Sequence, residues 1–113
     1  MKIKKIVSAD ERVASIRDNR RLFLKWAERK KVKLFNSLSE VQPNTRKELT
    51  KGQRCSFVND YGVCFQGFTI MGFGIPDEYG NCVYIDKDSY WCPVKSETLI
   101  LEENNFVSRA FTE

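Results

Sequence analysis

The fold of this chain is decided by the stretch Val63-Cys64-Phe65-Gln66-Gly67-Phe68-Thr69-Ile70-Met71-Gly72-Phe73. The stretch is rich in β-branched and aromatic side chains, which favour an extended strand. Its two internal glycines, Gly67 and Gly72, predict a bend or a bulge. We therefore expect one curved strand or two short strands here.

Further strand candidates lie on both sides of this stretch. They are residues 53–58, 82–85, 90–94 and 99–101. Turn residues rich in Asn, Asp, Gly and Pro separate them. Pro93 indicates that its strand lies at a sheet edge or that the strand ends there. Several short strands with closely spaced turns predict a small sandwich or barrel.

About five strands in about fifty residues resemble a small SH3-like barrel. The likeness covers roughly residues 49–101 and is architectural. It is carried by Leu49-Thr50-Lys51-Gly52-Gln53 before the first strand, by a Gly-x-x-Phe-x-Gly run from Gly62, and by the hairpin-like stretch from Val83 to Val94. The chain also resembles short uncharacterised proteins of bacterial plasmids, phages and integrative elements, a likeness that supplies no functional residue.

Residues 8–38 are predicted to form a basic helical arm. A capping box at 8–11 begins it, and neither Gly nor Pro follows before its end. Apolar residues recur at spacings of three, four and seven, which is typical of one face of a helix. Polar residues at 18–20 interrupt this stripe. The pattern therefore predicts a short helix near 9–18 and a longer one near 19–38, with one continuous helix as the alternative.

The length of 113 residues predicts a single domain. We expect an α+β fold in which the basic helix or helix pair packs on a small antiparallel SH3-like β-barrel of about five strands. Its parts are a helical arm (8–38), a connector (39–51), the barrel (52–101) and a tail (102–113). Helix packing is expected because a barrel of this size is marginal by itself.

The net charge of +4 hides an asymmetry between the two halves of the chain. Residues 1–54 carry sixteen Lys or Arg and six Asp or Glu, a net charge of +10. Residues 55–113 carry three Lys or Arg and nine Asp or Glu, a net charge of −6. Such an asymmetry indicates a nucleic-acid, membrane-surface or acidic-protein contact on the basic side, or simple attraction between the two parts.

Residues 57–91 contain nine aromatic side chains. Most of the Phe residues are expected to fill the core, whereas Tyr and Trp keep a polar group for a surface role. The candidate partner-binding residues are Tyr61, Tyr79, Tyr84, Tyr90 and Trp91. Acidic residues in the same turns favour a basic or extended protein segment as the ligand. The leading hypothesis is a non-enzymatic protein-binding module that regulates or inhibits a larger complex in a bacterial or mobile-element setting.

Two alternatives stay open. The first is a sequence-independent nucleic-acid-binding protein. Its candidate residues form a cationic row spaced by four: Arg17, Arg21, Lys25, Arg29 and Lys33. The second is a structural homo-oligomer that associates through the helix stripe or the tail.

The sequence predicts neither an enzyme nor a cofactor. Histidine is absent, and no P-loop or nucleotide-binding glycine motif is present. Cys55, Cys64, Cys82 and Cys92 form no C-x-x-C pair, so buried free thiols are expected rather than a disulfide or a metal site. No apolar run is long enough for a membrane helix, and a signal peptide pattern is missing, so we expect a cytoplasmic protein without membrane contact.

Overall fold

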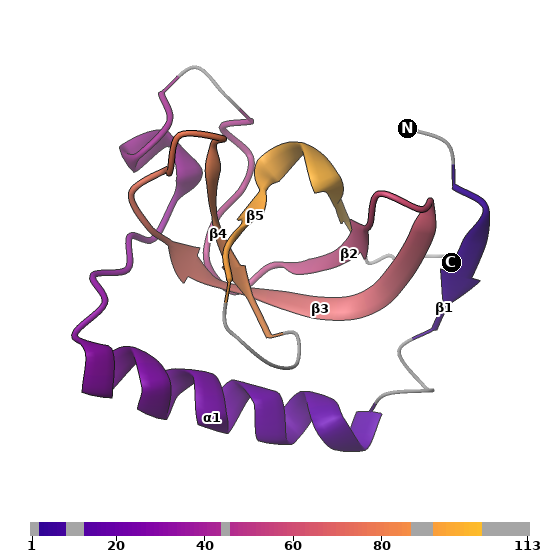
Figure 1. Ribbon diagram of the computed structural model, residues 1–113, viewed down its shortest axis with the longest axis horizontal. Helices are drawn as coiled ribbons and strands as arrows, with labels where there is room; N and C mark the ends of the chain where they lie inside the picture. Colours follow the sequence, from indigo (N-terminus) through magenta and orange to yellow (C-terminus); the bar gives the residue numbers. More distant parts are fainter. Residues whose placement is uncertain (1–2, 9–12, 44–45, 87–91, 103–113) are drawn as a thin grey trace.

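The computed structural model describes residues 3–8, 13–43, 46–86 and 92–102, with the side chains of 13–17 left out. In this described part the architecture is α+β, with one α-helix and one six-stranded, mostly antiparallel sheet (Figure 1). The α+β class predicted from the sequence is confirmed.

The elements follow one another in a simple order. They are β1 (Lys5–Val7), α1 (Val13–Lys30), η2 (Leu38–Glu40), β2 (Arg54–Val58), β3 (Val63–Phe73), β4 (Asn81–Ile85), β5 (Val94–Lys95), η3 (Ser96–Thr98) and β6 (Leu99–Leu101), where η marks a 3-10 turn. Hydrogen-bonded strands follow the order β5-β4-β3-β2-β6, and β1 pairs in parallel with β3. The two end strands, β5 and β6, do not pair with each other in the described residues. The sheet is thus open and has six strands, in place of the predicted barrel of about five.

The strand β3 is the centre of the sheet and is continuous over its whole length, so the single curved strand is the correct alternative (Figure 1). Its first part pairs with β1 and β2, and its last part pairs with β4. Gly67 has a φ of 86°, which side chains other than glycine rarely adopt. The pairing with β4 shifts register between Ile70 and Gly72, so both predicted irregularities exist within one strand.

The helix α1 runs without a break through residues 18–20, so the predicted pair of helices is wrong. Asn19 is buried, and Arg20 forms an ion pair with the buried Asp86 (Nε–Oδ2 2.7 Å). The polar gap in the apolar stripe is therefore filled by polar contacts to the sheet. A rule based on apolar spacing alone cannot anticipate such a contact.

The helix also ends earlier than predicted, at Lys30 rather than near residue 38. Lys31 takes a left-handed conformation (φ 56°), and the Val32 amide donates to the Ala27 carbonyl (3.0 Å), which closes the helix end. The chain then runs extended, and the Phe35 amide donates to the Phe73 carbonyl (2.7 Å). Phe35 and Ser37, predicted to lie in the last turns of the helix, instead form isolated antiparallel bridges to Phe73 and Thr50.

Two apolar clusters hold the fold together. The larger one is built by the sheet and by the segments before β2, and it includes Leu38 and Leu49, which are both fully buried. The smaller one joins α1 to β3 and β4: Phe23 and Ala27 pack with Met71, with Tyr84 beside them. The segment 39–51, predicted as a connector, therefore also supplies core residues.

The first ordered element is a strand rather than the helical arm. Lys5, Ile6 and Val7 pair with residues 63–65 at the start of β3. The sequence reading missed β1 because three residues are too few to show a periodic pattern. Two predictions lie outside the described residues. The capping box at 8–11 includes residues 9–11, and the tail at 102–113 includes residues 103–113, which are not described.

Candidate functional site

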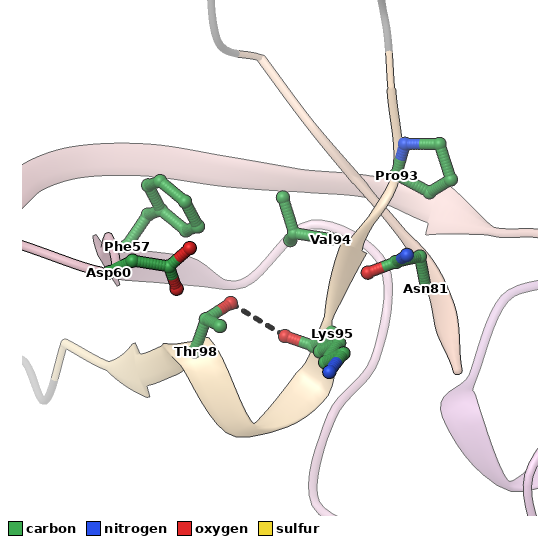
Figure 2. Close-up of a pocket in the computed structure, with 7 residues that line it drawn as sticks. All are labelled: Phe57, Asp60, Asn81, Pro93, Val94, Lys95 and Thr98. Carbon is green, nitrogen blue, oxygen red and sulfur yellow. Dashed lines mark hydrogen bonds between the residues drawn. The ribbon is translucent and has the colours of Figure 1, made fainter. Parts of the chain in front are cut away.

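A small cavity opens between β2, β4, β5 and η3. Its volume is about 230 Å³, and its lining comes from five places in the sequence. The lining residues are Phe57, Asp60, Asn81, Pro93, Val94, Lys95 and Thr98 (Figure 2). Although β2 and β5 are not neighbours in the sheet, both contribute to the cavity, which therefore lies where the curved sheet brings these two strands toward each other.

The lining combines an apolar part with several polar groups. Phe57, Pro93 and Val94 supply ring and branched side chains, and Asp60, Asn81 and Lys95 supply charge and an amide. Figure 2 shows Phe57 and Asp60 on one side of the space, with Pro93 and Asn81 on the other. Such a mixture can hold an apolar side chain of a ligand while the polar groups form hydrogen bonds with the backbone of that ligand.

One wall of the cavity is held in place by a side chain from the connector. Arg46 Nη1 donates to the carbonyl oxygens of Ser96 (2.7 Å) and Leu99 (2.6 Å), at the two ends of η3. Arg46 Nε also donates to Glu48 Oε2 (3.0 Å), which holds the guanidinium in position. Within η3, Thr98 Oγ1 donates to the Lys95 carbonyl (2.6 Å). These hydrogen bonds from Arg46 and Thr98 connect the backbone of the wall that carries Thr98 to the rest of the fold.

Two turns with matching structure lie beside the cavity. The first is Asn59-Asp60-Tyr61-Gly62-Val63, and the second is Asp77-Glu78-Tyr79-Gly80-Asn81. In each turn the first side chain accepts hydrogen bonds from the backbone amides two and four residues later, at 2.8–3.0 Å. In each turn the glycine amide also donates to the first carbonyl (3.1 and 3.0 Å). We call these two segments the tyrosine turns.

The glycine in each tyrosine turn has a positive φ, 80° at Gly62 and 86° at Gly80, which explains why glycine stands there. The tyrosine before it points into solvent: Tyr61 is 81% exposed and Tyr79 is 68% exposed. Asp60 of the first turn and Asn81 of the second line the cavity. Two of the predicted partner-binding tyrosines thus belong to turns that each contribute one lining residue to the same cavity.

The other predicted partner-binding residues have different positions. Tyr84 is half-buried between the sheet and α1, with its ring centroid 5.7 Å from that of Phe23 and 6.0 Å from that of Trp26. This packing gives Tyr84 a role in holding the helix rather than a place on the exposed surface. Tyr90 and Trp91 lie outside the described residues.

The predicted cationic row is only partly a feature of the helix. Arg21, Lys25 and Arg29 lie on α1 and are exposed, whereas Lys33 comes after the helix end and stands 5.1 Å from the ring centroid of Phe35. Arg17 lies on α1, but its side chain is outside the described part. The structure therefore keeps three of the five residues together on one described surface.

All four cysteines are free thiols, as expected. Cys55, Cys64 and Cys82 are buried, but Cys92 is exposed, so the expectation of burial is wrong for Cys92. Within the described ranges, no group of three or more Cys, Asp or Glu side chains is placed to hold a metal ion. No helix in that same part of the chain has both the length and the apolar character needed to cross a membrane.

Sequence reasoning named Tyr61 and Tyr79, whose turns supply Asp60 and Asn81 to the cavity, but it did not name the cavity residues Phe57, Val94 and Thr98. These residues come from three separate elements, so no local pattern joins them. One signal was present: the Asx-acid-Tyr-Gly pattern occurs twice, at Asn59 and at Asp77. Comparison with known protein families, curated proteins and solved structures found no match to this chain.

Proposed function

We propose that this chain is a non-enzymatic protein-binding module whose cavity, between the two tyrosine turns, takes an extended segment of a partner protein. The observation that carries this proposal is the position of Asp60 and Asn81. Each belongs to a tyrosine turn, and both line the same cavity. Tyr61 and Tyr79, both highly exposed, therefore lie one and two residues in sequence from groups that line one small, partly apolar depression. Exposed Tyr beside an apolar pocket is typical of binding hot spots.

The chemistry of the cavity suits a peptide better than a substrate that must react. Phe57, Pro93 and Val94 offer apolar contact to one side chain, and the Asn81 amide can both donate to and accept from a peptide backbone. The acids Asp60 and Glu78 stand next to the two tyrosines. This charge favours a ligand with a Lys or Arg near its apolar residue.

The architecture supports the same class of function. We propose that residues 49–101 form an SH3-like module whose barrel is left open between β5 and β6. The support is the run of short strands around a curved central strand, joined by tight turns. SH3-like barrels use exposed aromatic residues to hold proline-rich or extended peptides. A cytoplasmic regulator or inhibitor of a larger complex, in a bacterial or mobile-element setting, is part of this proposal and rests on the sequence likeness.

The test is a selection of random peptides on the full chain, followed by binding measurements on the peptides recovered. Selected peptides should perturb the NMR amide signals of Asp60, Asn81 and Thr98. The double variant Tyr61→Ala/Tyr79→Ala should weaken binding by roughly tenfold or more while the fold is kept, because aromatic hot spots contribute more than 1 kcal/mol each. Recovery of no peptide, or unchanged affinity of a folded double variant, would contradict the proposal.

The matched control is Leu24→Ala. Leu24 is also a large exposed side chain, at 55% exposure, but it lies on α1 and does not line the cavity. Its removal should leave peptide affinity unchanged. An equal loss of affinity in the control and in the tyrosine double variant would show that binding follows general surface hydrophobicity, which would also contradict the proposal.

A further inference from the structure

The outward side of α1 carries a row of three cations. Arg21, Lys25 and Arg29 are exposed, whereas Phe23 and Ala27 between them are buried against the sheet. Residues four apart on a helix lie about 6 Å apart along its axis and about 40° apart around it. The three side chains therefore project from one side over about 12 Å of helix. We call this row the cationic face.

The rotation of α1 that exposes this row is fixed by contacts on the opposite side. Arg20 donates from Nε to Asp86 and from Nη2 to Thr69 Oγ1 (2.6 Å), so it is held against the sheet. Trp26 packs its ring near Phe23 at a centroid distance of 5.8 Å. The helix therefore cannot turn its cations inward without breaking both the ion pair and the apolar cluster.

The cationic face carries little compensating charge. Asp18 lies 3.7 Å from Arg21, but both side chains are more than half exposed, so this pair contributes little and opens easily. Glu28 is the one acid between residues 21 and 33. Lys30, Lys31 and Lys33 are exposed and extend the positive charge beyond the helix end. The helix dipole explains cations in the last turn but not Arg21 and Lys25 in the middle of the helix.

We infer that the cationic face binds the phosphate backbone of duplex nucleic acid without reading its sequence. A row of exposed cations is complementary in charge to a phosphate backbone. Asn and Gln, which read adenine, are missing from this face because Asn19 of this helix is buried. The Lys and Arg side chains that remain can pair with phosphate oxygens whatever the base sequence. This inference concerns a different surface from the cavity and does not depend on the proposed peptide binding.

The same surface disfavours single-stranded nucleic acid and an acidic protein. Proteins bind single strands by stacking bases on aromatic side chains, and Phe23 and Trp26 of α1 pack toward Tyr84 on the sheet. A protein interface needs a contiguous apolar core. Leu22 and Leu24 are exposed, but residues two apart project about 200° apart around a helix, so each stands by itself.

The experiment measures fluorescence anisotropy of a labelled duplex DNA of about 20 base pairs, titrated with the full chain at increasing salt. Affinity should fall with salt at a log–log slope between about −3 and −5, as expected for roughly three to six phosphate contacts. A second duplex of unrelated sequence should bind equally well. The triple variant R21Q/K25Q/R29Q should bind roughly tenfold more weakly or worse, because it removes three of these contacts.

The matched control is K5Q/K47Q/K51Q, which removes three exposed lysines away from α1 and so lowers the net charge equally. It should keep most of the affinity, and circular dichroism should show both variants folded. Four results would overturn the inference: no duplex binding at low salt, equal losses in the two triple variants, tighter binding to the matching single strand, or a preference between duplex sequences.

Discussion

Arg20 on α1 and Asp86 at the end of β4 form an ion pair between residues 66 positions apart in the sequence, with 2.7 Å between Nε and Oδ2. Asp86 is fully buried, and its other oxygen accepts a hydrogen bond from the Thr69 amide on β3 (2.7 Å). One carboxylate thus joins the helix to two neighbouring strands. This contact decides which side of α1 faces the sheet and therefore which side remains for a ligand.

Arg20→Gln should destabilise the fold by about 2–3 kcal/mol in urea denaturation, because it leaves the buried Asp86 carboxylate without its countercharge. This loss is smaller than the about 3–5 kcal/mol typical of a fully buried pair, since the Arg20 side chain is 43% exposed and water reaches it. The neighbouring change Arg21→Gln breaks only an exposed pair and should cost no more than about 0.5 kcal/mol. Equal losses in the two variants would contradict this account of the helix anchor.

Phe23→Ala should cost about 3–5 kcal/mol, because Phe23 is fully buried between α1 and the sheet and its removal leaves a cavity. Leu24→Ala, at the next position, should change stability by less than about 0.5 kcal/mol, since Leu24 is 55% exposed. If Phe23→Ala does not fold, Phe23→Leu provides the measurement and should lose less, because most of the apolar volume remains. A larger loss at Leu24 than at Phe23 would mean that the helix has a different rotation.

The tyrosine turn at Asp77 should weaken in acid. The side chain and the backbone amide of Asn81 donate to the Asp77 carboxylate and hold its pKa below the usual value of 3.8. A carboxyl whose pKa is lower in the folded state stabilises the fold above its ordinary pKa, and this contribution is lost as the pH falls through the folded pKa. The NMR amide signals of Tyr79 and Asn81 should titrate with a midpoint below 3.8. They should not titrate in Asp77→Asn, and a midpoint above 3.8 would contradict the prediction.

The buried thiols should resist alkylation. Burial raises the pKa of Cys55 to about 12 and that of Cys82 to about 11, from an ordinary value of 9.0, with help from nearby carboxylates. Iodoacetamide at pH 8 should therefore modify the exposed Cys92 first and should reach Cys55 and Cys82 only after unfolding. The unfolded thiols ionise near pH 9 while the folded ones stay protonated, so stability should fall as the pH rises from 9 toward 11. Rapid labelling of Cys55 in the folded chain would contradict this prediction.

Most of the strands could be predicted from the sequence because their signals are local; β1 was missed, and the strand expected at 90–94 is β5 at Val94–Lys95. The β-branched and aromatic run at 63–73 and the Asx-Gly turns on both sides of it place β2, β3 and β4 to within one residue. The candidate site was predictable only in part, for the same reason. Tyr61 and Tyr79 stand in recognisable turns, whereas the cavity needs Phe57 and Val94 from strands that do not pair with each other.

The helix shows where local signals fail. Its end at Lys31 uses a left-handed conformation in a residue other than glycine, which no propensity rule anticipates. The residues after it include the helix formers Lys33 and Leu34, but Phe35 gains backbone hydrogen bonds to Phe73 on β3 instead. Tertiary pairing outweighs helix propensity here, because propensity differences are a few tenths of a kcal/mol per residue.

By itself the sequence determined the strands β2, β3, β4 and β6, the turns that carry Tyr61 and Tyr79, and the separation of a basic half from an acidic half. These follow from residue type and short-range spacing, which act within a few positions of the chain. Only the tertiary structure decided that the polar residues 18–20 continue the helix, that the half-exposed Arg20 side chain pairs with Asp86, and that Arg21 stays exposed. The reason is physical: a buried carboxylate needs a countercharge, and only the folded chain brings one to it across 66 residues.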